Sequence, residues 1–177
     1  MSSQADIDAL FDDAPAAQDA MDAASPVNSE TGLATDFMNQ YNEITMILDM
    51  LGDMPELFED IANWKPKTYA EHFEASQFQD KDKIVAAYDN APEEYRGLFD
   101  GCTMRLNALL LKGVMILGNM IEQGETDTLP GAVALISGPA TQLMDNMNGI
   151  IHGSTEVADQ SEIDALIDGD LVARYGT

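Results

Sequence analysis

Hydrophobic residues between positions 29 and 153 recur at intervals of three and four, which is the spacing of a buried helix face. The first such stretch, residues 30–51, follows Ser29, a residue type that caps helix N-termini. Gly52 and Pro55 should end or kink this helix. Its apolar face consists of Leu33, Phe37, Tyr41, Ile44, Leu48 and Leu51.

Shorter helical segments follow this first helix. Residues 56–64 form one segment, which Lys65-Pro66 stops because the residue before a proline avoids helical geometry. Residues 65–79 are irregular or briefly helical. A short helix after Asp80 carries Ile84 and closes at Asn90-Ala91-Pro92.

The strongest apolar stripe begins at Pro92 and ends at Gly124, which predicts a helix about 45 Å long. Thr128 and Pro130 begin a further helical segment that continues to Gly153. We expect Ser137-Gly138-Pro139 to break or kink that segment.

The absence of alternating β-branched runs makes the fold class all-α, a helical bundle with a long central helix. The predicted divisions are a docking peptide at 1–12, a disordered linker at 13–28, the bundle at 29–153 and a C-terminal tail at 154–177. The longest stripe is close to a heptad repeat, so pairing of two subunits into a homodimer is an additional prediction.

A formal charge of −24 excludes nucleic acid and anionic membrane surfaces as favoured partners and favours a basic groove on a protein. Residues 106–121 are too short and too polar for membrane insertion. The first residues lack the pattern of a signal peptide, and Cys102, the single cysteine, lies in an apolar helical pattern. We therefore expect a cytoplasmic protein with a buried, structural cysteine.

The two ends of the chain carry nearly the same sequence. Five of eight positions are identical, Asp is exchanged for Glu at a sixth, and the last position is apolar in both copies. This duplication outside the bundle indicates a duplicated function. The copies are Gln4-Ala5-Asp6-Ile7-Asp8-Ala9-Leu10-Phe11 and Gln160-Ser161-Glu162-Ile163-Asp164-Ala165-Leu166-Ile167.

In a helix, Ile7, Leu10 and Phe11 form one apolar ridge, and Asp6 and Asp8 lie off it. A helix this short is marginal in water, so we expect each copy to fold on docking into a partner's groove. The alternative is that each end folds back on the bundle as a minor helix. The predicted partner-binding residues are Gln4, Asp6, Ile7, Asp8, Leu10 and Phe11 with Gln160, Glu162, Ile163, Asp164, Leu166 and Ile167.

The sequence Ser3-Gln4-Ala5-Asp6-Ile7-Asp8-Ala9-Leu10 closely resembles the N-terminal peptide of the flagellar switch protein FliM, which binds phosphorylated CheY. The C-terminal copy resembles it too, with Asp159 in place of the serine. The likeness covers about twenty residues and does not extend to the FliM body. It implies the response regulator CheY as partner, with flagellar switch or chemoreceptor array components as further partners.

An all-α body with a tethered CheY-binding helix also resembles, in layout, the CheZ phosphatases, in which an acid and an amide lie one helical turn apart. Asp36 and Gln40 have that spacing, and Asp145 and Asn148 have the three-residue spacing of the CheC and CheX phosphatases. Such pairs also arise by chance in so acidic a chain, so a solvated polar face is the alternative. Any Mg²⁺ would belong to the receiver partner.

Other chemistry is sparse, because His72 and His152 lack the neighbours of a phosphotransfer or metal site. We therefore expect no metal site and no cofactor of the chain's own. The leading hypothesis is a bacterial chemotaxis regulator that binds phosphorylated CheY through both ends and either promotes its dephosphorylation or links it to another component. The alternative is a non-enzymatic acidic helical adaptor, a CheY sink or a flagellar chaperone.

Overall fold

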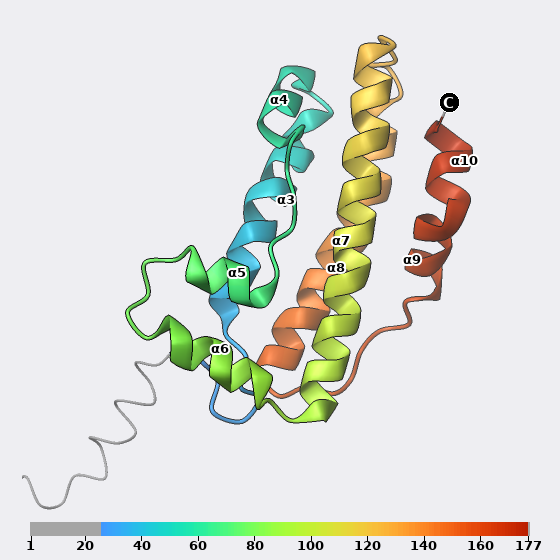
Figure 1. Cartoon of the computed structure of the whole chain (residues 1–177). Helices are drawn as coiled ribbons and strands as arrows, with labels where there is room; N and C mark the ends of the chain where they lie inside the picture. Colours follow the sequence, from blue (N-terminus) through green and yellow to red (C-terminus); the bar gives the residue numbers. More distant parts are fainter. Residues whose placement is uncertain (1–25, 177) are drawn as a thin grey trace, which may run out of the picture.

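A computed structural model describes residues 26–176 and confirms the all-α class (Figure 1). No strand occurs among these residues, and their one isolated β-bridge joins Val27 to Ala34. The helices are η1 (Thr35–Met38), α3 (Asn39–Leu51), η2 (Pro55–Leu57), α4 (Phe58–Ile61), α5 (Tyr69–Glu74), α6 (Lys81–Asp89), α7 (Glu93–Glu122), α8 (Leu129–Ile151), α9 (Ser161–Ala165), η3 (Leu166–Asp170) and α10 (Leu171–Tyr175).

The centre of the molecule is the antiparallel hairpin of α7 and α8, which Figure 1 shows one in front of the other. Gly124 allows the turn between them because its φ of 75° lies in the left-handed region that favours glycine. α3 flanks this hairpin on one side, and the C-terminal segment 161–175 flanks it on the other. The buried apolar faces of α3, α7 and α8 share one core.

Of the break or kink predicted at Ser137-Gly138-Pro139, the break is wrong, because α8 runs without interruption from Leu129 to Ile151 with Pro139 inside it. An internal proline removes one backbone hydrogen bond. However, Ile136, Ala140 and Leu143 on either side of it are fully buried, and this packing holds the two halves of the helix in register.

The first helix also begins later than predicted. Neither Ser29 nor Asn28 caps this helix. Asn28 closes a turn before it, because its Oδ1 accepts hydrogen bonds from the amides of Glu30 and Thr31 at 2.9 and 3.1 Å. Helical structure then begins only at Thr35. The buried hydroxyl of Thr31 donates to the carbonyl of Ile151 at 2.8 Å, which attaches this turn to the end of α8.

Of the short helices between α3 and α7, α5 and α6 cover one end of the core, and α4 lies at the opposite end (Figure 1). Thr68 and Glu71 form a capping box at the start of α5, so the irregular segment 65–79 does contain a brief helix. Tyr69 stacks on Tyr88 with ring centroids 4.3 Å apart, which joins α5 to α6. The helix predicted after Asp80 is confirmed as α6.

Within the described residues, α7 is the one helix long and apolar enough to cross a membrane by length and composition, a test that core helices also pass. One face of α7 lies in the core, including Leu106, Leu109 and Leu110. Met104, Leu111 and Met115 lie outside the core and are 69, 43 and 55% exposed.

Candidate functional site

The C-terminal copy of the repeated sequence lies along α7 as a short helical segment, α9 continued by the first residues of η3, which is kinked at Gly169. Of its apolar ridge, Ile163 and Leu166 are buried, only 3 and 8% exposed, and Ile167 packs half-buried against the core. Its flanking acid Glu162 is exposed. This copy was expected either to be a free docking peptide or to fold back on the bundle as a minor helix. In the structure it folds back on the bundle, so residues 154–176 are not a detached tail.

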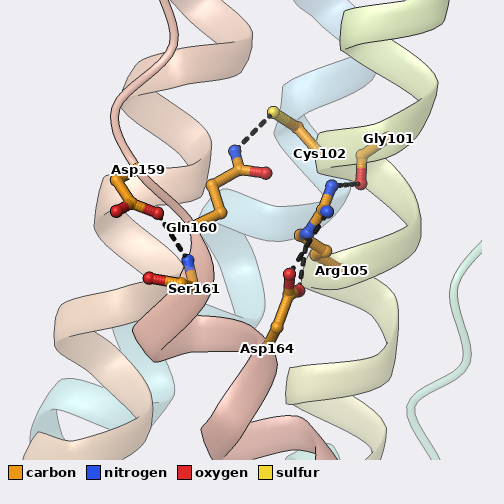
Figure 2. A network of polar contacts seen from close by, with 7 residues as sticks. All are labelled: Gly101, Cys102, Arg105, Asp159, Gln160, Ser161 and Asp164. Atoms are coloured by element: carbon orange, nitrogen blue, oxygen red, sulfur yellow. Dashed lines mark hydrogen bonds and ion pairs between the residues drawn. The ribbon is translucent and has the colours of Figure 1, made fainter.

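An ion pair fixes this copy on α7 (Figure 2). The guanidinium of Arg105 donates to Asp164 from Nε at 2.7 Å and from Nη2 at 3.3 Å, which makes the contact two-pronged. The same guanidinium donates to the carbonyl of Gly101 at 3.3 Å. The hydrogen bond to Asp164 raises the pKa of Arg105. The pair is about one-third to two-fifths exposed, so salt screens it in part.

Gln160 and Cys102 make a second contact, in which Gln160 Nε2 donates to Cys102 Sγ at 3.2 Å. Burial raises the pKa of the Cys102 thiol, and this outweighs the lowering by Gln160 and Arg105. The thiol therefore stays protonated and unreactive at neutral pH, in agreement with a structural role.

Lys112 makes a third contact, two turns further along α7 from Arg105. Its ammonium group donates to the carbonyl of Ile167, just before the kink at Gly169, whose backbone is not helical. Carbonyls in the last turn before such a kink lack an intrahelical partner and can accept from other donors. Arg105 and Lys112 thus bring two of the eight basic residues of this acidic chain to the C-terminal copy.

Asp159 begins this segment. Its Oδ1 accepts a hydrogen bond from the amide of Ser161 at 2.9 Å, which lowers the pKa of the carboxyl. The residue that replaces the serine of the FliM peptide thus closes a turn just before the helix, by a bond that a serine side chain can also form.

The N-terminal copy, with Gln4, Asp6, Ile7, Asp8, Leu10 and Phe11, lies outside the described residues, as does most of the predicted linker 13–28. Its role in binding stays a prediction.

The amide of Gln40 is already engaged in structural contacts. Its Oε1 accepts from the amide of Lys67 at 2.9 Å, and its Nε2 donates to the carbonyl of the same residue at 3.2 Å. Asp36 is half-buried in η1 near His72, whose pKa is lowered mainly by burial. The Asp36–Gln40 pair is therefore one turn apart as predicted, but the amide would have to leave Lys67 to orient a water molecule.

Asp145 and Asn148 lie one turn apart on α8, Asp145 exposed and Asn148 half-buried. No hydrogen bond joins either side chain to another of the described residues. This pair is therefore the more accessible of the two to a partner. The described residues contain no group of three or more side chains that could hold a metal ion.

Comparisons with protein-family models, with curated proteins and with solved structures give no match. The fold and the site define a class only: an all-α bundle that holds a copy of its own terminal peptide on its central helix. Sequence reasoning missed Arg105, Lys112 and Leu171, a fully buried residue just beyond the copy. The partners of Arg105 and Lys112 lie more than fifty residues away, so no local pattern identifies these two residues, whereas Leu171 continues the apolar spacing four residues after Ile167.

Proposed function

We propose that this chain is a bacterial chemotaxis regulator that binds phosphorylated CheY through its two FliM-like terminal peptides. The observation that carries the proposal is the repeated sequence, Gln4 to Leu10 and Gln160 to Leu166. The conformation of the C-terminal copy supports it. That copy is helical, buries Ile163 and Leu166 as anchors, and pairs Asp164 with a cation, which are the features of helix-in-groove recognition.

Docking is tested by titration calorimetry of the full chain with phosphorylated CheY. Leu10→Ala and Leu166→Ala each remove an anchor worth about 2 kcal/mol or more, so the double variant should lose measurable binding. Met46→Ala is the control, because Met46 is an apolar side chain that is 60% exposed on α3 and belongs to neither copy. Unchanged affinity in the double variant would contradict the proposal.

A catalytic role of the body is the second candidate, supported by the accessible pair Asp145 and Asn148 on α8. In such a mechanism the amide orients a water molecule for attack on the aspartyl phosphate, and the carboxylate engages the lysine of the receiver. Tethering by a terminal peptide would raise the local CheY concentration to the millimolar range or so, so weak recognition by the body suffices.

Phosphate release from phosphorylated CheY tests this second candidate. Acceleration by the full chain that is lost in Asn148→Ala and kept in Gln142→Ala supports catalysis, because Gln142 is an exposed amide on the same helix. No acceleration at saturating protein would leave the non-enzymatic adaptor as the function of the body.

The homodimer belongs to the same proposal. Met104, Leu111 and Met115 form an exposed apolar stripe on α7, and residues 101–121 contain no acidic residue. In a chain of charge −24, such a stripe is a place where two copies can meet without like-charge repulsion. Sedimentation equilibrium of the wild-type chain and of Leu111→Glu tests it, and a monomeric wild-type chain would contradict it.

A further inference from the structure

We infer that the face of α7 that holds the C-terminal copy is a peptide-binding site that also accepts the N-terminal copy, residues 4–11 of the same chain. This face is defined by Cys102, Arg105 and Lys112. The inference stands on the contacts of the C-terminal copy and does not depend on CheY binding.

The first argument is which positions the two copies share. Gln160, Ile163, Asp164 and Leu166 are the side chains of the C-terminal copy that are bonded to α7 or buried. All four are identical in the N-terminal copy, as Gln4, Ile7, Asp8 and Leu10.

The second argument is which positions differ. Ser161 and Glu162 are exposed, and they are replaced by Ala5 and Asp6. The half-buried Ile167 is replaced by another apolar residue, Phe11. Lys112 contacts Ile167 through the backbone carbonyl, which any residue at this position provides. The contacts of this face therefore cannot distinguish the two copies by charge or by hydrogen bonding.

The third argument is reach. Pro26 and Val27 lie beside Ile151 and His152, at the end of the bundle from which the C-terminal segment departs. The fourteen residues 12–25 span at most about 50 Å when extended. The distance along α7 from Glu93 to Lys112 is about 30 Å. The N-terminal copy can therefore reach the site within one chain.

The two copies are not equal occupants, because the C-terminal segment has a further anchor. Leu171, at the start of α10, is fully buried, and Pro15 occupies the equivalent place after the N-terminal copy. The C-terminal copy therefore holds the site at rest, and the N-terminal copy takes it when the C-terminal copy leaves. Each end thereby controls the availability of the other.

Amide hydrogen exchange of the full chain, measured by mass spectrometry, tests whether the N-terminal copy replaces the C-terminal copy on α7. Leu166→Asp with Leu171→Asp releases the C-terminal segment without changing the N-terminal copy. We expect the amides of residues 7–11 to gain about fivefold protection in this variant. Amides of α8 that remain protected show in the same measurement that the bundle is folded.

Charge reversal tests the register. Asp8→Arg in the released variant should remove the protection of residues 7–11, because the new positive charge would lie opposite Arg105. Adding Arg105→Asp should restore the protection. Asp6→Arg is the matched control and should keep the protection, because the equivalent Glu162 is exposed. Equal effects of Asp6→Arg and Asp8→Arg, or no gain of protection after release, would overturn the inference.

A second measurement uses the wild-type chain and so carries no folding risk. A synthetic peptide of residues 2–12 in excess should speed amide exchange at residues 163–171, and the Asp8→Arg peptide should not. No effect of either peptide would overturn the site. Protection of residues 7–11 that grows with protein concentration would place the peptide on a second copy and overturn its intramolecular arrangement.

Discussion

Arg105 on α7 and Asp164 on α9 form a two-pronged ion pair, with Nε and Nη2 donating to the two carboxylate oxygens at 2.7 and 3.3 Å. The pair joins residues 59 positions apart and is the one salt bridge among the described residues that joins two separate helices. It places Asp164, the acidic residue that is identical in both copies, opposite one of the eight basic residues of the chain.

Arg105→Ala should loosen the C-terminal segment and leave the bundle intact. A partly exposed ion pair contributes about 0.2–1 kcal/mol, so amide exchange at residues 163–171 should rise by at most about fivefold. Exchange in α8 should stay unchanged. Arg96→Ala is the control, because the contacts of Arg96 are with Glu93 on α7 and with Asp89 and Tyr88 on α6, and none is with the C-terminal segment. Unaltered exchange at residues 163–171 would show that the pair does not hold the segment.

Gly118→Ala should destabilise the fold. A Cβ at Gly118 would lie 2.7 Å from Phe58 Cζ, so the ring must move, and such overpacking costs about 1–3 kcal/mol. The matched control is Gly97→Ala on the same helix, where the nearest atom is Glu93 Oε1 at 3.6 Å. There, alanine should stabilise by about 0.5–1 kcal/mol through helix propensity. Urea unfolding measures both, and a Gly118→Ala variant as stable as Gly97→Ala would refute the close approach.

Tyr41 should make stability fall at high pH. Burial raises the pKa of this phenol above its ordinary value near 10, despite its hydrogen bond to Asn107. A folded-state pKa above the unfolded one means that the stabilisation is fully present below pH 10 and is lost as the pH rises further. Each pH unit above 10 should cost about 1.4 kcal/mol for this group.

The measurement for Tyr41 is the free energy of unfolding in urea between pH 9 and 11.5. Tyr41→Phe should show a shallower decline with pH than the wild-type chain, and the difference isolates this phenol from the lysines and the other tyrosines. Parallel curves for the two proteins would mean that Tyr41 ionises in the folded state as it does in the unfolded chain.

The helices of the bundle were predictable because their apolar residues repeat at three and four positions, and α6, α7 and most of α3 confirm this. The prediction was wrong where a local preference competes with packing. Pro139 disfavours a helix interior, yet buried neighbours on both sides keep α8 continuous. Ser29 is a capping residue by type, yet the chain forms a turn closed by Asn28 at this point, and the first helix begins at Thr35 without a side-chain cap.

The candidate site was predictable in part. The repeated sequence and the apolar ridge at Ile163 and Leu166 follow from local spacing. Both side chains are buried, but within this chain and not in the groove of a partner, for which they were predicted as anchors. Their burial against α7 was only one of two alternatives. The contacts with Arg105 and Lys112 depend on how a segment more than fifty residues away packs on α7, and helical periodicity carries no information about that.

The burial of the C-terminal copy makes its release part of any binding to CheY, and this gives the last prediction. In a Leu10→Ala chain only the C-terminal copy retains its full set of anchors, and its apparent affinity is reduced by the small fraction of molecules in which that copy is free. Arg105→Ala in this background removes the ion pair that holds the C-terminal copy on α7. The substitution leaves the sequence of the copy itself unchanged. Binding of phosphorylated CheY, measured by titration calorimetry, should therefore tighten by up to about fivefold.

Arg96→Ala in the same background should leave the affinity unchanged. Equal or weaker binding after Arg105→Ala would show that CheY does not compete with α7 for this peptide.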